Sequence, residues 1–232
     1  MYNQIAAIMG RLKFYKTTDS GYVSEKLAGI IDGELTKRRR VLWLLSGGSA
    51  ITVAVGAAKL LSASDVSMLS VGLIDERYGP PGHADSNWAQ LQAAGFKLPG
   101  GQMIPVLDGS GIEQTTRKYN RFISSMFNPG VYKIGLMGIG SDGHTAGLLP
   151  GSRAAESTDF VVSYQGPDYR RITLSARGIA GLDKAVVYAS GKAKQIAIDN
   201  LAKEIPPSSQ PAQLLKLIDD VDVYNDIKGE KI

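Results

Sequence analysis

The stretch VLWLLSGGSAITVAVGAAKLL, residues 41–61, decides the fold class. Residues 41–45 form an almost continuous apolar run, which is typical of a strand buried on both faces of a parallel sheet. The glycine-rich segment SGGS follows at residues 46–49, and the apolar run after it has the length of a helix. A strand, a turn and a helix in this order form the first half of a βαβ unit.

The same alternation of short apolar strands and helical patterns continues on both sides of this stretch. A helix of about 19 residues is expected from Ser20, and another over residues 112–127. Residues 160–164 and 171–175 are expected to form an antiparallel pair or an addition to a sheet edge. Further strands are expected at residues 12–17, 70–75, 103–106, 132–138 and 184–190. The pattern predicts a doubly wound α/β fold with a mostly parallel sheet and helices on both faces, in one domain over residues 1–232.

The composition excludes several classes of site. Hydrophobic residues make up 44% of the chain and charged residues 21%, as in ordinary globular proteins. There is no cysteine, which excludes thiol catalysis, cysteine–zinc sites and disulfides, and a reducing cytoplasm is the expected environment. No run reaches the ~18 apolar residues of a membrane span, and the N-terminal segment does not have the pattern of a signal peptide.

The net charge of +4 is modest and is compatible with an anionic substrate. The one dense basic run, residues 37–40, is expected to end a helix, where cations suit the helix dipole. The other charges are scattered, and no aromatic platform accompanies them, so no nucleic-acid partner is expected.

Ligands of doubly wound sheets bind beyond the carboxyl ends of the strands. The first candidate site there is formed by Ser46, Gly47, Gly48 and Ser49. Glycines let the backbone approach an anion closely, and the N–H groups of the following helix start attract phosphate. The spacing matches neither GxGxxG nor a Walker loop, which argues against dinucleotides and nucleoside triphosphates. A Gly-Gly segment can also be only a turn.

The second candidate is the loop IDERYGPPGHADSNW at residues 74–88. Asp75, Glu76 and Arg77 stand where a buried strand opens into this loop, and three charges there rarely serve a core. The alternative is an ion pair that only fixes the loop. Ser86 is a plausible helix N-cap, and His83 is expected to be an ordinary surface residue.

The third candidate is IGLMGIGSDGHTAGLLPGS at residues 134–152. A buried strand ends there in glycine-rich sequence, and Asp142 to Thr145 are expected to lead into a short helix. His144 is one of two histidines in the chain, and a neutral imidazole is a suitable base for taking a proton from water. A nearby carboxylate could orient it.

Three cations also lie next to expected strand ends or helix starts. Arg170 and Arg171 precede the strand ITLS, and Lys194 lies where a strand gives way to a helix. A dianionic phosphate is held best by several such donors that converge with backbone N–H groups. Each cation could equally be an ordinary solvated surface charge.

Taken in order, these motifs resemble the 6-phosphogluconolactonase family over residues 12–217. The matching segments are SGGS, DER followed by proline and SNW, GIGSDGHTAGLLPG, RITLS, and glycine and lysine at Gly191 and Lys194. The related glucosamine-6-phosphate deaminases resemble the chain around SGGS, Arg171 and Lys194, but they carry a Phe-Asn-Glu-Pro sequence after DGH where this chain reads TAGLLP. That difference favours the lactonase.

The resemblance implies hydrolysis of 6-phospho-D-glucono-1,5-lactone with no metal and no other cofactor. It implies that His144 is the base, that Asp142 orients it, and that Arg77 stabilises the oxyanion. Asp75 would orient Arg77 or water. The segment Ser46–Ser49, Arg171 and Lys194 would bind the phosphate. The expected partner is the small sugar-phosphate lactone, and the expected assembly is a monomer or weak homodimer.

Three other functions compete with this one. A sugar-phosphate deaminase or isomerase would need a ring-opening acid, which the sequence after DGH does not supply. A phosphosugar sensor without activity would not need the intact DGHT motif. A nucleic-acid binder is disfavoured by the scattered charge.

Overall fold

The computed structural model describes residues 12–232, and its main element is an eight-stranded, wholly parallel sheet. Its strand order is β11-β1-β10-β9-β6-β2-β3-β5. The strands are β1 (Leu12–Lys16), β2 (Arg40–Leu45), β3 (Leu69–Leu73), β5 (Gln102–Met103), β6 (Val131–Met137), β9 (Lys184–Ala189), β10 (Asp220–Asn225) and β11 (Glu230–Lys231). This confirms the predicted doubly wound α/β class. The N-terminal segment, where no signal peptide is predicted, lies outside the described residues.

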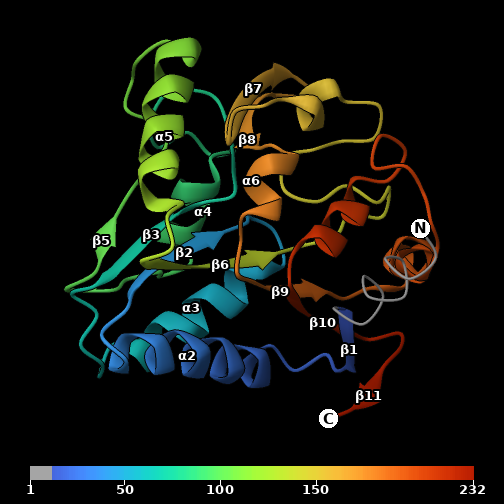
Figure 1. Ribbon diagram of the computed structural model, residues 1–232, viewed down its shortest axis with the longest axis horizontal. Coiled ribbons are helices and arrows are strands. Elements are labelled where there is room, and N and C mark those ends of the chain that lie inside the picture. The colour runs from blue at the N-terminus through green and yellow to red at the C-terminus, as the bar shows by residue number, and fades with distance from the viewer. Residues whose placement is uncertain (1–11) are drawn as a thin grey trace.

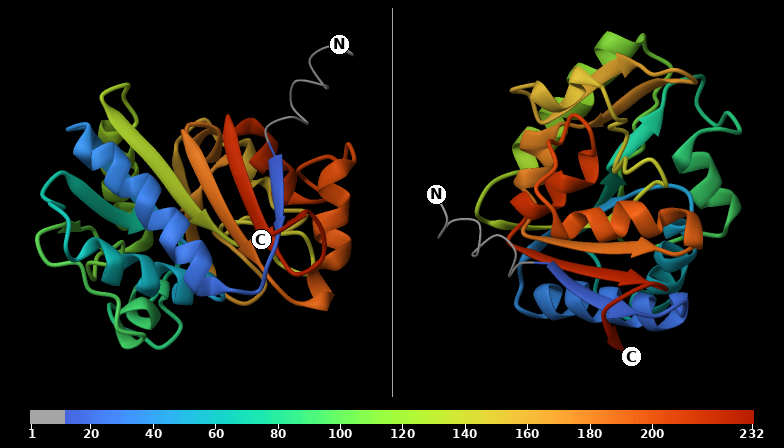
Figure 2. Two further views of the ribbon diagram at one scale, coloured as in Figure 1. Left: turned by 90° about the horizontal axis from the view of Figure 1, so that it is seen from below. Right: turned by 90° about the vertical axis from the view of Figure 1, so that its right-hand side faces the viewer.

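The sheet is buried because its central strands are apolar on both faces. All five residues of the VLWLL run in β2 are inaccessible to solvent. Helices α2 (Ser20–Thr36) and α3 (Ala50–Leu61) pack together on one face, and Figure 2 shows α2 lying over the sheet there. Helices α5 (Ile112–Met126) and α6 (Ala176–Ala180) lie on the other face (Figure 1). This two-sided cover explains why the strands are not amphipathic.

The remaining elements are short and lie mostly in the C-terminal third. They are α4 (Asn87–Ala93), α7 (Gln195–Asp199) and the 3₁₀ turns η1 (Arg153–Glu156), η2 (Lys192–Lys194), η3 (Asn200–Ala202) and η4 (Pro211–Leu217). No helix within residues 12–232 is long and apolar enough to cross a membrane. The basic run at residues 37–40 begins at the C-cap of α2, where Lys37 and Arg39 form ion pairs with Glu34.

A second, antiparallel sheet lies on the same side of the main sheet as α5 and α6 (Figure 1). It consists of β4 (Asp75–Arg77), β8 (Arg170–Leu174) and β7 (Val161–Gln165), in that order. The expected antiparallel pair of β7 and β8 is confirmed. However, the strand expected over residues 70–75 ends at Leu73, and Asp75–Arg77, expected where that strand opens into a loop, form a separate edge strand paired with β8.

The strand order reverses between β2 and β6. From β2 the chain proceeds outward through β3 and β5, and then returns to β6 on the other side of β2. A hydrogen bond links the carboxyl ends of β2 and β6: the Ser46 N–H donates to the Leu136 carbonyl at 3.0 Å. Ligands of open α/β sheets bind at such a switch point.

Candidate active site

A cavity of about 230 Å³ opens at this switch point. Every site residue predicted from the sequence lines it except Asp142, which instead contacts the lining residue His144. The predicted lining residues are Ser46, Gly47, Gly48, Ser49, Asp75, Arg77, His144, Arg171 and Lys194. The cavity is also lined by residues that were not predicted, namely Asn87, Gly138, Ile139, Gly140 and Ala146. Segments far apart in the chain therefore converge on one space.

The SGGS segment forms a tight turn between β2 and α3. Gly48 has a φ of +64°, in the left-handed region that favours glycine. A Cβ at Gly47 would overlap the side chain of Asn87 and lie 2.7 Å from its Cγ, so only glycine fits there. Ser49 is the N-cap of α3 and makes no side-chain capping bond, while the Ile51 N–H donates to the Gly48 carbonyl at 3.1 Å. The positive end of the helix dipole at this turn attracts an anion.

Lys194 reaches this turn from the far end of the chain. Its Nζ lies 3.5 Å from Oγ of Ser49, and η2 and α7 carry it there. Burial lowers the pKa of Lys194, and the carboxylate of Asp226 raises it in part. Asp226 also accepts the Gly191 N–H at 3.1 Å, which fixes the loop before η2. The cation and the glycine turn therefore face the same end of the cavity.

Arg171 and Arg77 enter from the second sheet, where they pair directly across β8 and β4. Nη2 of Arg171 donates to both carboxylate oxygens of Asp168 at 2.8 Å. Arg77 donates to the backbone carbonyl of Asp85 at 2.9 Å and has no carboxylate partner within residues 12–232. The ring of Tyr169 lies 5.7 Å from each guanidinium carbon. Arg77 is thus held in place at the cavity wall, where its charge acts on the buried carboxylate of Asp75 without an ion pair.

His144 and Asp142 form a pair on the loop after β6. Oδ1 of Asp142 lies 2.6 Å from Nδ1 of His144 and also accepts the His144 backbone N–H at 3.1 Å. Burial raises the pKa of Asp142, but the two hydrogen bonds and the imidazole charge outweigh it, and the net pKa is lowered. A Cβ at Gly140 would overlap the imidazole and lie 2.6 Å from Oδ1 of Asp142, so the pair depends on that glycine.

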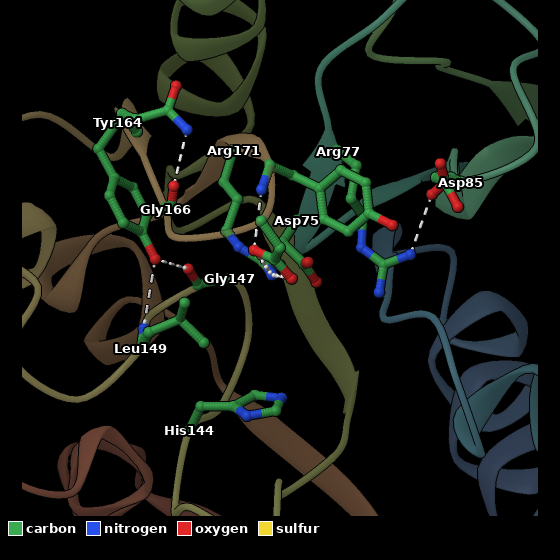
Figure 3. Close-up of polar contacts among 12 residues, drawn as sticks. Asp75, Arg77, Asp85, His144, Gly147, Leu149, Tyr164, Gly166 and Arg171 are labelled. Atoms are coloured by element: carbon green, nitrogen blue, oxygen red, sulfur yellow. Dashed lines mark hydrogen bonds and ion pairs between the residues drawn. The ribbon is translucent and has the colours of Figure 1, made fainter.

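The short helix predicted after His144 is absent. Residues 142–151 form turns, with an isolated bridge between Thr145 and Leu148. The segment is fixed by long-range bonds instead. The hydroxyl of Tyr164 donates to the Gly147 carbonyl at 2.6 Å (Figure 3), and Oγ1 of Thr173 accepts the Gly147 N–H at 3.0 Å. These bonds satisfy both backbone groups of Gly147, so this residue does not need helical hydrogen bonds.

Asp75 is 6% exposed and faces the same cavity. Burial raises its pKa, while Arg77, Arg171 and His144 lower it in part. Figure 3 shows Asp75, Arg171 and Arg77 around one space, with the imidazole of His144 across from them. The site therefore combines a histidine–aspartate pair, a buried carboxylate and two arginines.

Several contacts at the site carry little or no sequence signal. Asn87 follows the predicted N-cap Ser86, which is confirmed as the cap of α4. The SNW motif contains Asn87, but the pattern by itself predicts only a helix start. Asp168 and Tyr164 lie in or beside the β7–β8 hairpin, and nothing local in the sequence indicates that they contact Arg171 and the His144 loop. His83 is partly exposed, its Nε2 lies 2.9 Å from the Arg77 carbonyl, and it does not line the cavity.

No cluster of three or more histidine, aspartate or glutamate side chains is placed to bind a metal ion in the part of the chain that the structure describes. The donors gathered at the cavity are mostly nitrogen and hydroxyl groups. Such groups suit an oxyanion or a phosphate.

A family model described as glucosamine-6-phosphate isomerases/6-phosphogluconolactonase matches residues 20–223. The chain belongs to this family. Among its curated members, the 6-phosphogluconolactonase of Mycobacterium leprae is 27% identical over 212 residues, which cover 83% of this chain and 85% of the relative.

Solved structures of this family share the fold. The crystal structure of 6-phosphogluconolactonase from Thermotoga maritima matches with a TM-score of 0.80 at 23% identity, over 92% of this chain and 98% of that one. The structure of a monomeric glucosamine-6-phosphate deaminase matches with a TM-score of 0.75 at 20% identity, over 92% of this chain and 96% of that one. The two activities of the isomerase/lactonase family thus occur on the same architecture, and the site must distinguish them.

Proposed function

We propose that this chain hydrolyses 6-phospho-D-glucono-1,5-lactone to 6-phospho-D-gluconate, the lactonase step of the oxidative pentose phosphate route. The observation that carries the proposal is the Asp142–His144 pair on a cavity whose other walls supply two arginines, a lysine and a glycine turn. Its relatives named 6-phosphogluconolactonase support the same assignment.

The proposed reaction begins at Nε2 of His144. Because Nδ1 is engaged by Asp142, Nε2 is the nitrogen left to take a proton from water. The water oxygen attacks the lactone carbonyl carbon and forms a tetrahedral oxyanion. Its collapse breaks the bond to the ring oxygen, which takes the proton back from the imidazolium. A lactone is an activated ester, so this route needs neither a metal nor a covalent nucleophile.

Charge placement supports the remaining roles. Arg77, which forms no ion pair within residues 12–232, would stabilise the oxyanion, a contribution commonly worth several kcal/mol. Lys194, the Ser46–Ser49 segment and Arg171 would bind the phosphate. Asp75 would hold Arg77 or the water in place from the cavity wall.

The test compares two reactions of the purified chain. Hydrolysis of freshly generated 6-phosphogluconolactone should be fast, and ammonia release from glucosamine 6-phosphate should be absent. The opposite result would assign the chain to the deaminase branch of the family. Binding of 6-phosphogluconate without either turnover would make it a phosphosugar-binding protein.

A further inference from the structure

Asn87, which the proposed reaction does not use, lies between the two halves of the site. It is the first residue of α4, is 1% exposed and lines the cavity. Its Nδ2 donates to the backbone carbonyl of Asp75 at 2.8 Å and to Oδ2 of the same residue at 3.3 Å. Since both partners are acceptors, the orientation of the amide is determined.

The other end of the amide contacts the glycine turn. Oδ1 of Asn87 is buried and has no hydrogen-bond partner within residues 12–232. It packs so closely on Gly47 that a Cβ there would overlap it. A buried acceptor without a partner is unfavourable by about 1–3 kcal/mol. Packing alone does not explain a polar side chain here, and we infer that its other contact, with Asp75, has a role.

A buried carboxylate holds Asn87 in this position. Glu76, which is inaccessible to solvent, accepts the backbone N–H of Asn87 at 2.7 Å and that of Trp88 at 3.1 Å. It also accepts the hydroxyl of Ser86 at 2.8 Å and the backbone N–H of Arg77 at 2.8 Å. These bonds tie the start of α4 to β4, so Asn87 cannot move without breaking several of them.

We propose that Asn87 is a positioning residue that holds the carboxylate of Asp75 in the cavity and sets its distance from the Gly47 turn. The link joins the end that would bind phosphate to the end that would bind the lactone carbonyl. Its consequence for catalysis rests on the proposed function, whereas the link itself does not.

The carboxylate of Asp75 is surrounded by groups from every neighbouring element. Arg77 lies on its own strand, Arg171 on β8 and His144 on the loop after β6. The hydroxyls of Tyr119 on α5 and Tyr164 on β7 also lie near enough to feel its charge. None of these groups donates a hydrogen bond to the carboxylate of Asp75 within residues 12–232, whereas the side-chain amide of Asn87 does. Removing it makes the charged form of Asp75 harder to maintain.

The first experiment follows Asp75 by carbon-13 NMR titration of the carboxyl groups, with its signal assigned by its loss in Asp75→Asn. In Asn87→Ala the titration midpoint should rise by about one pH unit, the equivalent of one hydrogen bond to a charged group. Asn87→Asp keeps the volume and replaces the donor with an acceptor, so its shift should be larger. Gln90→Ala is the matched control, because Gln90 lies on the same helix and also donates to a backbone carbonyl, that of Ala84. An unchanged midpoint in both Asn87 variants would overturn the proposal.

The second experiment tests the contact with the turn by a double-mutant cycle. Gly47→Ala should weaken the binding of 6-phosphogluconate, measured by calorimetry, about tenfold or more in the wild-type background. In the Asn87→Ala background the same change should cost clearly less, because the overlapping amide is gone. Additive losses would overturn the proposed contact. Should wild-type protein fail to hydrolyse the lactone, the proposed function fails, and the NMR titration still decides the Asn87–Asp75 link.

Discussion

Nδ1 of His144 lies 2.6 Å from Oδ1 of Asp142, and only Gly143 separates the two residues in the chain. The short spacing is possible because Gly143 has a φ of +83° and because Gly140 leaves room for the imidazole. The carboxylate fixes both the ring plane and the ring nitrogen that stays free. Because its two members are separated by one residue, the Asp142–His144 pair can be recognised in the sequence. Its role in the cavity can be tested by substitution.

Replacing His144 by alanine should lower kcat about 10²–10⁴-fold, the usual contribution of a general base. The fold should be retained because the ring is on the cavity surface, with an exposed side-chain fraction of 40%. Steady-state hydrolysis of 6-phosphogluconolactone and the far-UV circular dichroism spectrum check both points. A folded variant with kcat close to that of wild type would remove His144 from the mechanism.

Gly140→Ala should disrupt the same pair without touching either member. The added methyl group would overlap the imidazole and the Asp142 carboxylate, whereas a methyl group added at Gly138 would have its nearest neighbouring atom 4.0 Å away. We therefore expect Gly140→Ala to reduce kcat at least about tenfold, since misorientation of a catalytic group is costly, and Gly138→Ala to reduce it much less. Equal effects of the two substitutions would contradict the steric argument.

Asp75→Asn should make the protein more stable at neutral pH while lowering its activity. Burial raises the pKa of Asp75 in the folded protein above the ordinary value of 3.8. At a pH between the unfolded-state pKa and the raised folded-state pKa, the folded state binds more protons than the unfolded state. The free energy of unfolding therefore falls as pH rises through that window. The Asp75→Asn variant has no carboxyl group at this position, so its free energy of unfolding does not decrease for this reason.

Urea unfolding of both proteins from pH 4 to pH 7 checks the prediction. The stability difference between Asp75→Asn and wild type should grow with pH and then level off above the folded-state pKa. Asp85→Asn is the control, because its side chain is exposed in the neighbouring loop. Parallel stability curves for Asp75→Asn and wild type would contradict the assigned cause.

The phosphate site predicts a difference between two substrates. Arg171→Ala or Lys194→Ala should weaken binding of the phosphorylated lactone by about 1.5–3 kcal/mol, the value of one charge-assisted hydrogen bond. Hydrolysis of unphosphorylated gluconolactone should change little. The quantity to measure is the ratio of kcat/KM for the two lactones, which should fall in both variants.

Each cation has a neighbouring control. Arg170 and Lys192 are exposed, lie one and two residues away, and do not line the cavity. Their alanine variants should keep the wild-type ratio. An unchanged ratio in Arg171→Ala and Lys194→Ala would move the phosphate to another part of the cavity.

His83→Ala should have a small effect, unlike His144→Ala. Its Nε2 contacts the Arg77 carbonyl at 2.9 Å, so the loss of one neutral hydrogen bond, about 0.5–1.5 kcal/mol, is the most that we expect in kcat/KM. The pH–rate profile should keep its shape. A loss as large as that of His144→Ala would place His83 in the reaction itself.

Much of the fold could be predicted because its signals are local. An apolar run of the length of β2, followed at once by a glycine turn, favours a strand inside a sheet that is covered on both faces. The site residues that follow strands could also be predicted, because the carboxyl ends of parallel strands lie at one edge of the sheet. The histidine–aspartate pair and the glycine turn are each contained in a few consecutive residues, and their chemistry follows from residue type and spacing.

Other features were decided only by tertiary structure. Nothing near Asp75 in the sequence indicates that it pairs with Thr173 in a second sheet, in a strand that also includes Glu76 and Arg77, where a loop was expected to begin. The expected helix after His144 is replaced by turns, in which Tyr164 and Thr173 satisfy both backbone groups of Gly147 from another sheet. Ser49 and Lys194 meet across 145 positions of the chain. Local patterns report burial and backbone preference, whereas these contacts depend on how separate elements pack, which no short stretch of sequence encodes.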